Sequence, residues 1–202
     1  QQLITVNAVY TINKQTTLQT DVALSNYDIN TFSSKDKANN NGLAAKFLLQ
    51  HTGKMKRDVQ LLSAIGYEWV DEKFRTIERL RSVEFARDWG LPIITQFANE
   101  HLPRLGFELK NTKTNASLKY NLDGYLRSDN FTAVRNAINY NTAKGFLGID
   151  YNTSLSLVQN KIPTGKGNYI KANADIGKTF TKLNNYQIGF TYLLEHNQQK
   201  YT

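Results

Sequence analysis

The chain has 202 residues, a formal net charge of +8 and 40% hydrophobic residues. It contains no cysteine, which excludes disulfide bonds and thiolate metal sites. No run of 18 apolar residues is present to form a transmembrane helix, and the basic residues are scattered, with no cluster larger than 54–57, so we expect no nucleic-acid partner.

Most of the sequence alternates apolar and polar residues with a period of two, which is the pattern of β-strands with unlike faces. In 4–12, for example, Ile4, Val6 and Tyr10 fall on one face, and Thr5 and Asn7 on the other. In chain order the pattern predicts ten strands, over 4–12, 18–25, 43–51, 59–70, 104–111, 116–127, 132–142, 146–157, 169–180 and 186–195. Most exceed the usual globular strand of about 5–6 residues and approach the roughly 9–11 that a tilted membrane strand needs.

The predicted links alternate in length along the chain. Short links fall at 13–16, 52–57, 112–115, 143–145 and 181–185, and three of the four links between them (28–41, 71–103, 128–131 and 159–168) are long. Transmembrane barrels have short periplasmic turns and longer extracellular loops. The spacing therefore favours an all-β, antiparallel, up-and-down transmembrane β-barrel over a soluble β-sandwich, whose strands also alternate. Within 159–168, "GKG" (165–167) is expected to be a flexible turn.

Charged residues fall in the middle of several predicted strands, on the polar side. In a barrel these side chains would face the lumen, and in a soluble sheet they would form a solvated face. The set comprises Asp21, Lys46, Lys119, Asp123, Arg135, Asp150, Lys171 and Asp175. Their signs are mixed, so they predict no ion selectivity. Tyrosine and tryptophan lie toward strand ends (Tyr10, Tyr67, Trp69, Tyr140, Tyr169 and Tyr186 among them), as expected where an apolar band meets lipid headgroups.

One segment breaks the alternation. Between Asp71 and Asp88, five acidic and five basic residues occur among 18 positions. Glu72 and Arg75, Glu78 and Arg81, and Glu84 and Arg87 are spaced to pair on a helix, and the apolar residues at 74, 77, 80 and 83 would form one stripe. Because ten charges are costly in hydrocarbon, we expect 71–103 to be a long extracellular-side loop folded over or into the barrel, or binding a partner. Its docking candidates are Glu78, Arg79, Arg81, Glu84, Arg87, Asp88 and Trp89.

Catalytic and metal-binding motifs are missing from the sequence. His51, His101 and His196 lack the spacing of a metal site, and the pair Glu100–His101 lies near Arg104 without any recognisable nucleophile motif. We therefore expect no catalytic residues, no metal and no cofactor.

The pieces "TTLQTDVALSNYDINTFSSKDKANNNGLAAKFLLQ" (16–50), "NASLKYNLDGYLRSD" (115–129) and "GKTFTKLNNYQIGFTYLL" (177–194) resemble outer-membrane β-barrel proteins of Gram-negative bacteria, of the Bacteroidota type. The resemblance covers nearly the whole chain, in strand and turn style more than in any one motif. It implies the cell outer membrane, contact with membrane lipid, and protein partners in an outer-membrane complex.

With the short turns on the periplasmic side, both chain ends would lie outside, whereas complete barrels of this class begin and end in the periplasm. We therefore expect 1–202 to be a single barrel domain or a segment of a larger barrel. The expected function is non-enzymatic: transport, secretion, or scaffolding of a surface complex. The alternative is a soluble β-sandwich or extended-sheet surface protein that binds glycan or protein.

Overall fold

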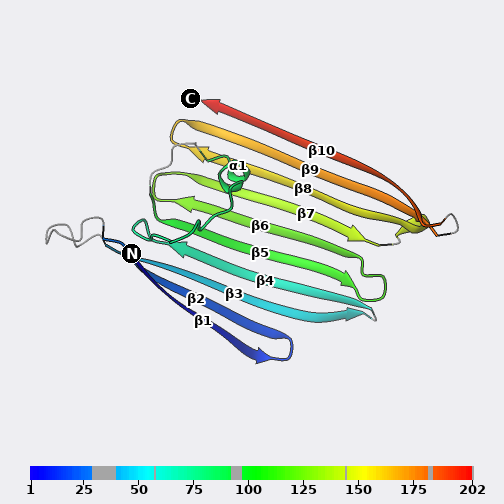
Figure 1. The fold of residues 1–202 in the computed structure, drawn as a ribbon, viewed down its shortest axis with the longest axis horizontal. Helices are drawn as coiled ribbons and strands as arrows, with labels where there is room; N and C mark the ends of the chain where they lie inside the picture. Colours follow the sequence, from blue (N-terminus) through cyan, green and yellow to red (C-terminus); the bar gives the residue numbers. More distant parts are fainter. Residues whose placement is uncertain (29–39, 57, 92–96, 144, 182–183, 202) are drawn as a thin grey trace.

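The computed structural model describes residues 1–201 except 29–39, 57, 92–96, 144 and 182–183. Ten β-strands dominate it (Figure 1). They are β1 (Gln2–Asn13), β2 (Thr16–Asn26), β3 (Asn41–Lys56), β4 (Val59–Val70), β5 (Glu100–Asn111), β6 (Ser117–Arg127), β7 (Thr132–Thr142), β8 (Ile149–Ile162), β9 (Gly165–Phe180) and β10 (Tyr186–Tyr201). The helical parts are the short α1 (Phe85–Trp89) and the 3-10 turn η2 (Phe146–Gly148).

The strands form one antiparallel sheet in which each strand pairs with its neighbours in the chain, in the order β1 to β10. The predicted number and order of strands are thereby confirmed, and the up-and-down topology with them. The sandwich form of the soluble alternative is wrong for the described residues, because they form one continuous sheet instead of two packed ones, whereas the extended-sheet form stays an open prediction. The sheet does not close: β1 and β10 are its two edges and lie far apart (Figure 1).

Several predicted boundaries were wrong: β3 and β10 extend beyond the predicted 51 and 195 to Lys56 and Tyr201, and β8 begins at Ile149 instead of 146. Two further differences change the links. The strand expected at 104–111 begins at Glu100, so the long link is 71–99. The long link expected at 159–168 is a two-residue turn, because β8 and β9 stay paired out to Ile162 and Gly165. "GKG" is therefore strand instead of flexible turn: these positions lack apolar alternation, and main-chain pairing carries the ladder through them. The link between β1 and β2 lies at one end of the sheet, and all five links at that end are short. The links at the opposite end are of mixed length, some long and some short.

The register gives the sheet two unlike faces. We call the face that carries Asp123 the polar face and the face that carries its neighbour Leu122 the apolar face. Directly paired residues share a face, so the pairs can be followed from strand to strand. The apolar face exposes large side chains over all ten strands, for example Ile4, Phe47 and Phe190.

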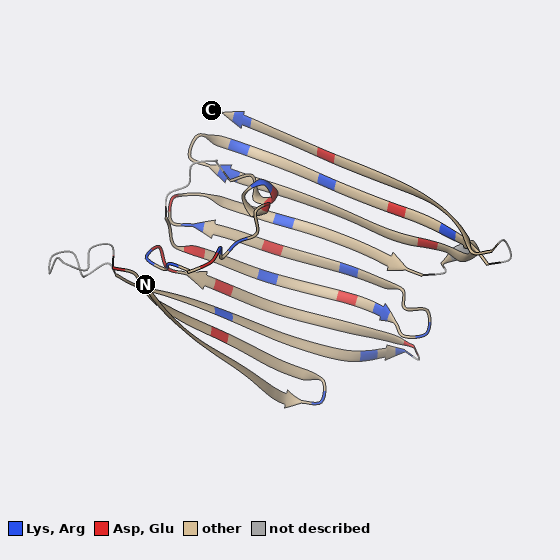
Figure 2. Ribbon diagram, in the orientation of Figure 1, with Lys and Arg blue, Asp and Glu red and all other residues tan. Residues whose placement is uncertain are grey.

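Charge divides sharply between the faces. Every strand Asp and Glu lies on the polar face by register, and Figure 2 shows these charges along the strands. Within the described strands, the apolar face carries no acid. Its charged residues are lysines within three residues of a strand end: Lys56, Lys161, Lys166, Lys178 and Lys200. The middle of the apolar face is therefore free of charge.

The link between β4 and β5 lies against the polar face. We call residues 71–99 the covering segment; its described parts are 71–91 and 97–99. In Figure 1 it carries α1 in front of the sheet, near the end at which β4 finishes and β5 begins. The buried apolar cluster lies under it and joins Trp89 to Tyr125, Phe131, Ala133, Val158, Ile162 and Tyr169 of the sheet and its turns. The only sizeable core in the described chain is thus on the polar face, between sheet and segment.

Candidate functional site: the polar face and its covering segment

The eight charged residues predicted to line a lumen all lie on the polar face by strand register. Asp21 and Lys46 are directly opposite each other on β2 and β3, and Asp123 and Arg135 on β6 and β7. Cross-strand neighbours of opposite charge stabilise a sheet modestly. The sequence therefore located one common face correctly, and whether that face lines a lumen stays a prediction.

Asp123 is the centre of an ion cluster on this face. Its Oδ1 accepts a hydrogen bond from Arg104 Nε at 2.7 Å, and its Oδ2 accepts from Arg135 Nη2 at 2.8 Å. The Asp123 side chain is 5% exposed, whereas that of Arg104 is 56% exposed. One carboxylate thus holds two guanidinium groups from the flanking strands, and local positive charge remains on the more exposed partner. Arg104 was not among the predicted lumen residues.

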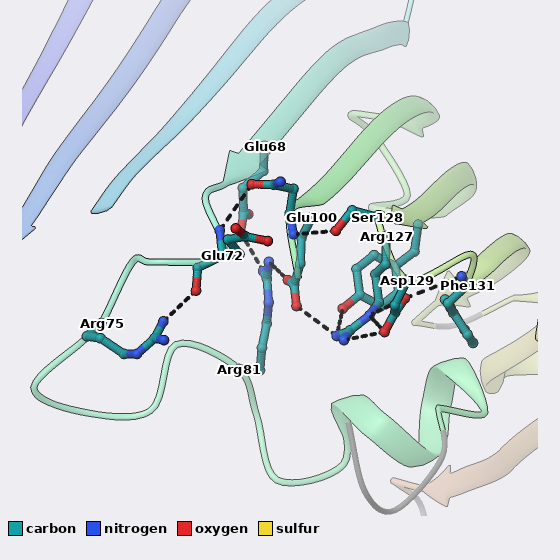
Figure 3. A network of polar contacts seen from close by, with 11 residues as sticks. Glu68, Glu72, Arg75, Arg81, Glu100, Arg127, Ser128, Asp129 and Phe131 are labelled. Carbon is teal, nitrogen blue, oxygen red and sulfur yellow. Dashed lines mark hydrogen bonds and ion pairs between the residues drawn. The ribbon is translucent and has the colours of Figure 1, made fainter. Parts of the chain in front are cut away.

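Arg81 connects the covering segment to the sheet (Figure 3). It donates to Glu68 at the end of β4 and to Glu100 Oε2 at the start of β5, the second contact at 2.8 Å. Burial alone would lower the pKa of Arg81, but the two carboxylates outweigh it and raise that pKa above its ordinary value. The guanidinium therefore stays charged and holds the two strand ends together.

The same network extends through Glu100. Its Oε1 accepts from Arg127 Nη1 at 3.2 Å, and Arg127 Nη2 donates to Asp129 Oδ2 at 2.8 Å in the following turn. The hydrogen bonds from Arg127 hold the pKa of Asp129 below its ordinary value. Carboxylates and guanidinium groups alternate from the covering segment to the β6–β7 turn (Figure 3), so each of these charged groups has a neighbour of opposite sign within the network.

Aromatic packing holds α1 on the sheet. Trp89 is 2% exposed and Tyr125 is fully buried, with ring centroids 5.3 Å apart. Phe85 meets Tyr125 edge-on at 5.3 Å, a favoured aromatic geometry. The Arg135 guanidinium carbon lies 4.8 Å from the centroid of the Trp89 ring, so the ion cluster and the aromatic cluster share Arg135.

Two close approaches fix the path of the segment. At its start, Gly42 of β3 lies against the main chain of Lys73 and Phe74, where any side chain would overlap it, and Ser25 Oγ accepts from Arg75 N at 2.9 Å. At the end of α1, Gly90 adopts a φ of 64°, the left-handed conformation that glycine adopts easily at a helix C-terminus. Asn160 of β8 donates to the carbonyl oxygens of Trp89 and Gly90, both at 3.1 Å.

The predicted docking residues divide into two groups. The first group makes contacts within the protein and comprises Arg81, Glu84, Arg87, Asp88 and Trp89. Arg87 is bonded to Glu84 at 2.8 Å, and Asp88 lies 4.0 Å from Lys171 of β9. Lys171 in turn lies 3.4 Å from Glu195 of β10. Glu78 and Arg79 are exposed and have no side-chain ion pair among the described residues.

Of the three predicted helical pairs, only Glu84–Arg87 forms. Arg81 turns to Glu68 and Glu100, and Arg75 donates to the carbonyl oxygens of Glu72 and Phe74. The predicted apolar stripe is also split: Phe74 is buried, whereas Ile77, Leu80 and Val83 are exposed. These expectations failed because they assumed a helix along the whole segment, whereas the helix has only five residues. The rest of the described segment is not helical, so residues three apart in it do not share a face.

The described residues contain no group of three or more His, Cys, Asp or Glu side chains placed to hold a metal ion. Nor does any helix of the described chain have the length and apolar character to cross a membrane. No family model matches the chain, and no curated protein or solved structure matches it.

Proposed function

We propose that the ten-stranded sheet is part of the wall of a β-barrel in a Gram-negative outer membrane, with the apolar face in contact with lipid. The observation that carries this proposal is the charge division between the faces. All strand carboxylates lie on one face, and the other exposes large apolar side chains with lysines only near strand ends. Charges are costly at the bilayer midplane, but lysines near the ends reach headgroups through their flexible stems.

Strand length and aromatic placement support the same proposal. The strands have 11 to 16 residues, which meets the roughly 9–11 needed to cross the hydrocarbon at a tilt. On the apolar face, Tyr10, Tyr140 and Tyr186 lie near one end of their strands, and Tyr67 and Trp69 near the opposite end. Tyrosine and tryptophan favour the two interfaces of a bilayer. Tyr169, which the sequence also suggested for a belt, is buried on the polar face.

The proposal requires both edges to be paired in the membrane, because unpaired backbone groups are not tolerated in lipid. β1 and β10 are not paired with each other. The barrel would therefore close either by direct pairing of these two strands or through further strands between them. In such a barrel the polar face and the covering segment would be on the lumen side. The protein would then act without catalysis, in transport or secretion, with the segment restricting the lumen.

A scaffolding role for a surface complex is favoured by the outer side of the covering segment. Ile77 is 68% exposed and Val83 75% exposed, next to Glu78 and Arg79, which have no ion pair with any residue that the structure describes. The covering segment is held against the sheet on one side and exposes apolar residues on the other, and an exposed apolar surface of this kind is suited to binding a protein partner.

The test uses adjacent residues of β6 on opposite faces. Leu122→Arg puts a charge in the middle of the apolar face, which should cost about 2–4 kcal/mol in a membrane and block insertion into lipid vesicles. Asn121→Arg puts the same charge on the polar face and should leave insertion intact. Insertion is measured by flotation with vesicles after refolding from urea. Equal insertion of the two variants, or folding of the unchanged chain in buffer without lipid or detergent, would contradict the proposal.

A further inference from the structure

A cavity of about 290 Å³ lies between the covering segment and the polar face. Arg81, Phe85 and Trp89 contribute to it from the segment, and Lys46, Leu48 and Arg104 from strands β3 and β5. Gly66 of β4 pairs with both Leu48 and Arg104, and its missing side chain leaves space between the two strands. The volume is near the lower end of ligand pockets, so the cavity suits a small molecule and not a polymer.

The charges of this cavity are unevenly satisfied. Four cations line it (Lys46, Arg81, Arg104 and Arg135), against three carboxylates (Glu68, Asp88 and Asp123). Glu68 is bound by Arg81, and Asp123 is shared between Arg104 and Arg135. Lys46 has no ion pair within 4.0 Å among the described residues, although Asp21 and Glu68 are its cross-strand neighbours. Positive charge is therefore in excess on the side of Lys46 and Arg104.

Hydrogen-bonding capacity is also left over. Arg104 uses its Nε toward Asp123, and its two terminal nitrogens make no hydrogen bond to the described residues. Arg81 Nε is buried without a hydrogen-bond partner there, and Asp88 Oδ1 is buried with Lys171 Nζ 4.0 Å away, too far for a hydrogen bond. Buried polar groups in folded proteins are nearly always satisfied. One buried donor, on Arg81, and two further donors on the more exposed Arg104 thus border the cavity, and donors of this kind match a ligand that offers mainly acceptors.

We propose that this cavity binds a small organic carboxylate, held by Lys46 and Arg104 and packed against Trp89 and Phe85. A carboxylate accepts from guanidinium and ammonium groups in charge-assisted hydrogen bonds, and the aromatic rings and Leu48 cover its carbon skeleton. The site depends on the sheet and the covering segment alone. It therefore holds whether or not the apolar face contacts lipid, and its test is independent of the membrane proposal.

Trp89 provides the readout. The chain has two tryptophans, and Trp69 lies on the apolar face, so Trp69→Phe leaves Trp89 as the sole reporter. The purified chain with this change, in zwitterionic detergent, is titrated with citrate and with succinate at constant ionic strength set with sodium chloride. We expect a saturable change in Trp89 fluorescence with the carboxylates and none with glucose.

Substitutions then locate the site. Lys46→Gln and Arg104→Gln should each weaken binding about tenfold or more, because each removes a charge-assisted contact. Lys110→Gln is the matched control: Lys110 is on β5 and on the polar face but outside the cavity, and it should bind within about twofold of the parent, since distant exposed charges are screened.

A second pair of variants changes space instead of charge. Gly66→Leu fills the cavity and should abolish binding. Gly66→Ala should retain binding, because its Cβ would be 3.5 Å from Leu48 and 3.6 Å from Arg104, ordinary contact distances. Circular dichroism confirms that each variant is folded. The proposal is overturned by the lack of a saturable response to either carboxylate, by equal losses in Lys46→Gln and Lys110→Gln, or by full binding in folded Gly66→Leu.

Discussion

The side-chain amide of Asn160 on β8 donates a hydrogen bond to the carbonyl oxygen of Trp89, 71 residues away in the chain, at 3.1 Å. Trp89 ends α1, and its carbonyl is one of those that a helix leaves without an internal partner. The sheet thus supplies the C-terminal cap of the helix that lies on it. The position of the covering segment therefore depends on a strand that lies about 70 residues further along the sequence.

Replacement of Asn160 by alanine should loosen the segment. The carbonyl oxygens of Trp89 and Gly90 would lose their partner in a buried site, which costs about 1–3 kcal/mol. Asn139→Ala on β7 is the matched control, because Asn139 is on the polar face and makes no side-chain hydrogen bond with the described residues. Urea unfolding and trypsin cleavage within 79–87 measure the effect. Equal stability and equal cleavage in the two variants would show that Asn160 does not anchor α1.

Gly90→Ala tests the same junction from the other side. Gly90 has a φ of 64°, which costs a non-glycine residue about 1–2 kcal/mol, and an added Cβ would overlap Asn160 Nδ2. The single variant should therefore be less stable than conformational strain alone predicts. In the double variant Gly90→Ala with Asn160→Ala the overlap is gone, so the two losses should sum to more than the measured loss. Strict additivity in urea unfolding would contradict this contact.

The strands were largely predictable from sequence, and the covering segment was not. A period of two along strands such as 116–127 reports directly on which face each residue occupies, so all eight charged residues were assigned to one face. Arg81 shows why the segment is different. The sequence offers Glu78 three residues earlier, whereas the structure pairs Arg81 with Glu68 and Glu100, which flank the segment on β4 and β5. Only the sheet register brings those strand ends together.

Some of the site could have been found with further use of the same pattern. Glu68 and Glu100 share the polar face with Asp123, and both adjoin the one segment that is rich in arginine. Asn160 and Tyr125 gave no such signal. Asn160 fell in the predicted link 159–168 and Tyr125 on the polar side of a predicted strand, and their roles appear only when α1 is placed over β6 to β9. Closure of the sheet likewise depends on how its two edge strands pair, and the alternation of residues within a strand does not report on that pairing.

Gly42→Ala should displace the start of the covering segment from β3. A methyl group at this position would overlap the main-chain atoms of Lys73 and Phe74, which cannot move without shifting the segment. Overpacking of this kind costs about 1–3 kcal/mol. Gly53→Ala is the control on the same strand, because its Cβ would meet nothing closer than 3.6 Å. Urea unfolding should show a clear loss for the first and little for the second. A harmless Gly42→Ala would mean that Phe74 does not pack on β3 as described.

Asp129→Asn should flatten the acid dependence of stability. Hydrogen bonds from Arg127 lower the pKa of Asp129 in the folded protein, so the ionised carboxylate favours folding. That contribution is fully present above the ordinary aspartate pKa of about 3.9 and is lost as the pH falls through the lower folded-state pKa. Because the Asp129 side chain is 36% exposed, solvent screens the pair and the effect should be modest.

The measurement compares urea midpoints of the parent chain and Asp129→Asn at pH 6 and at pH 3. The parent should be the more stable at pH 6, and the difference should shrink at pH 3, below the ordinary aspartate pKa of about 3.9 at which the unfolded chain takes up its proton. A difference that stays constant between the two pH values would show that Asp129 acts through its shape in the turn and not through its charge.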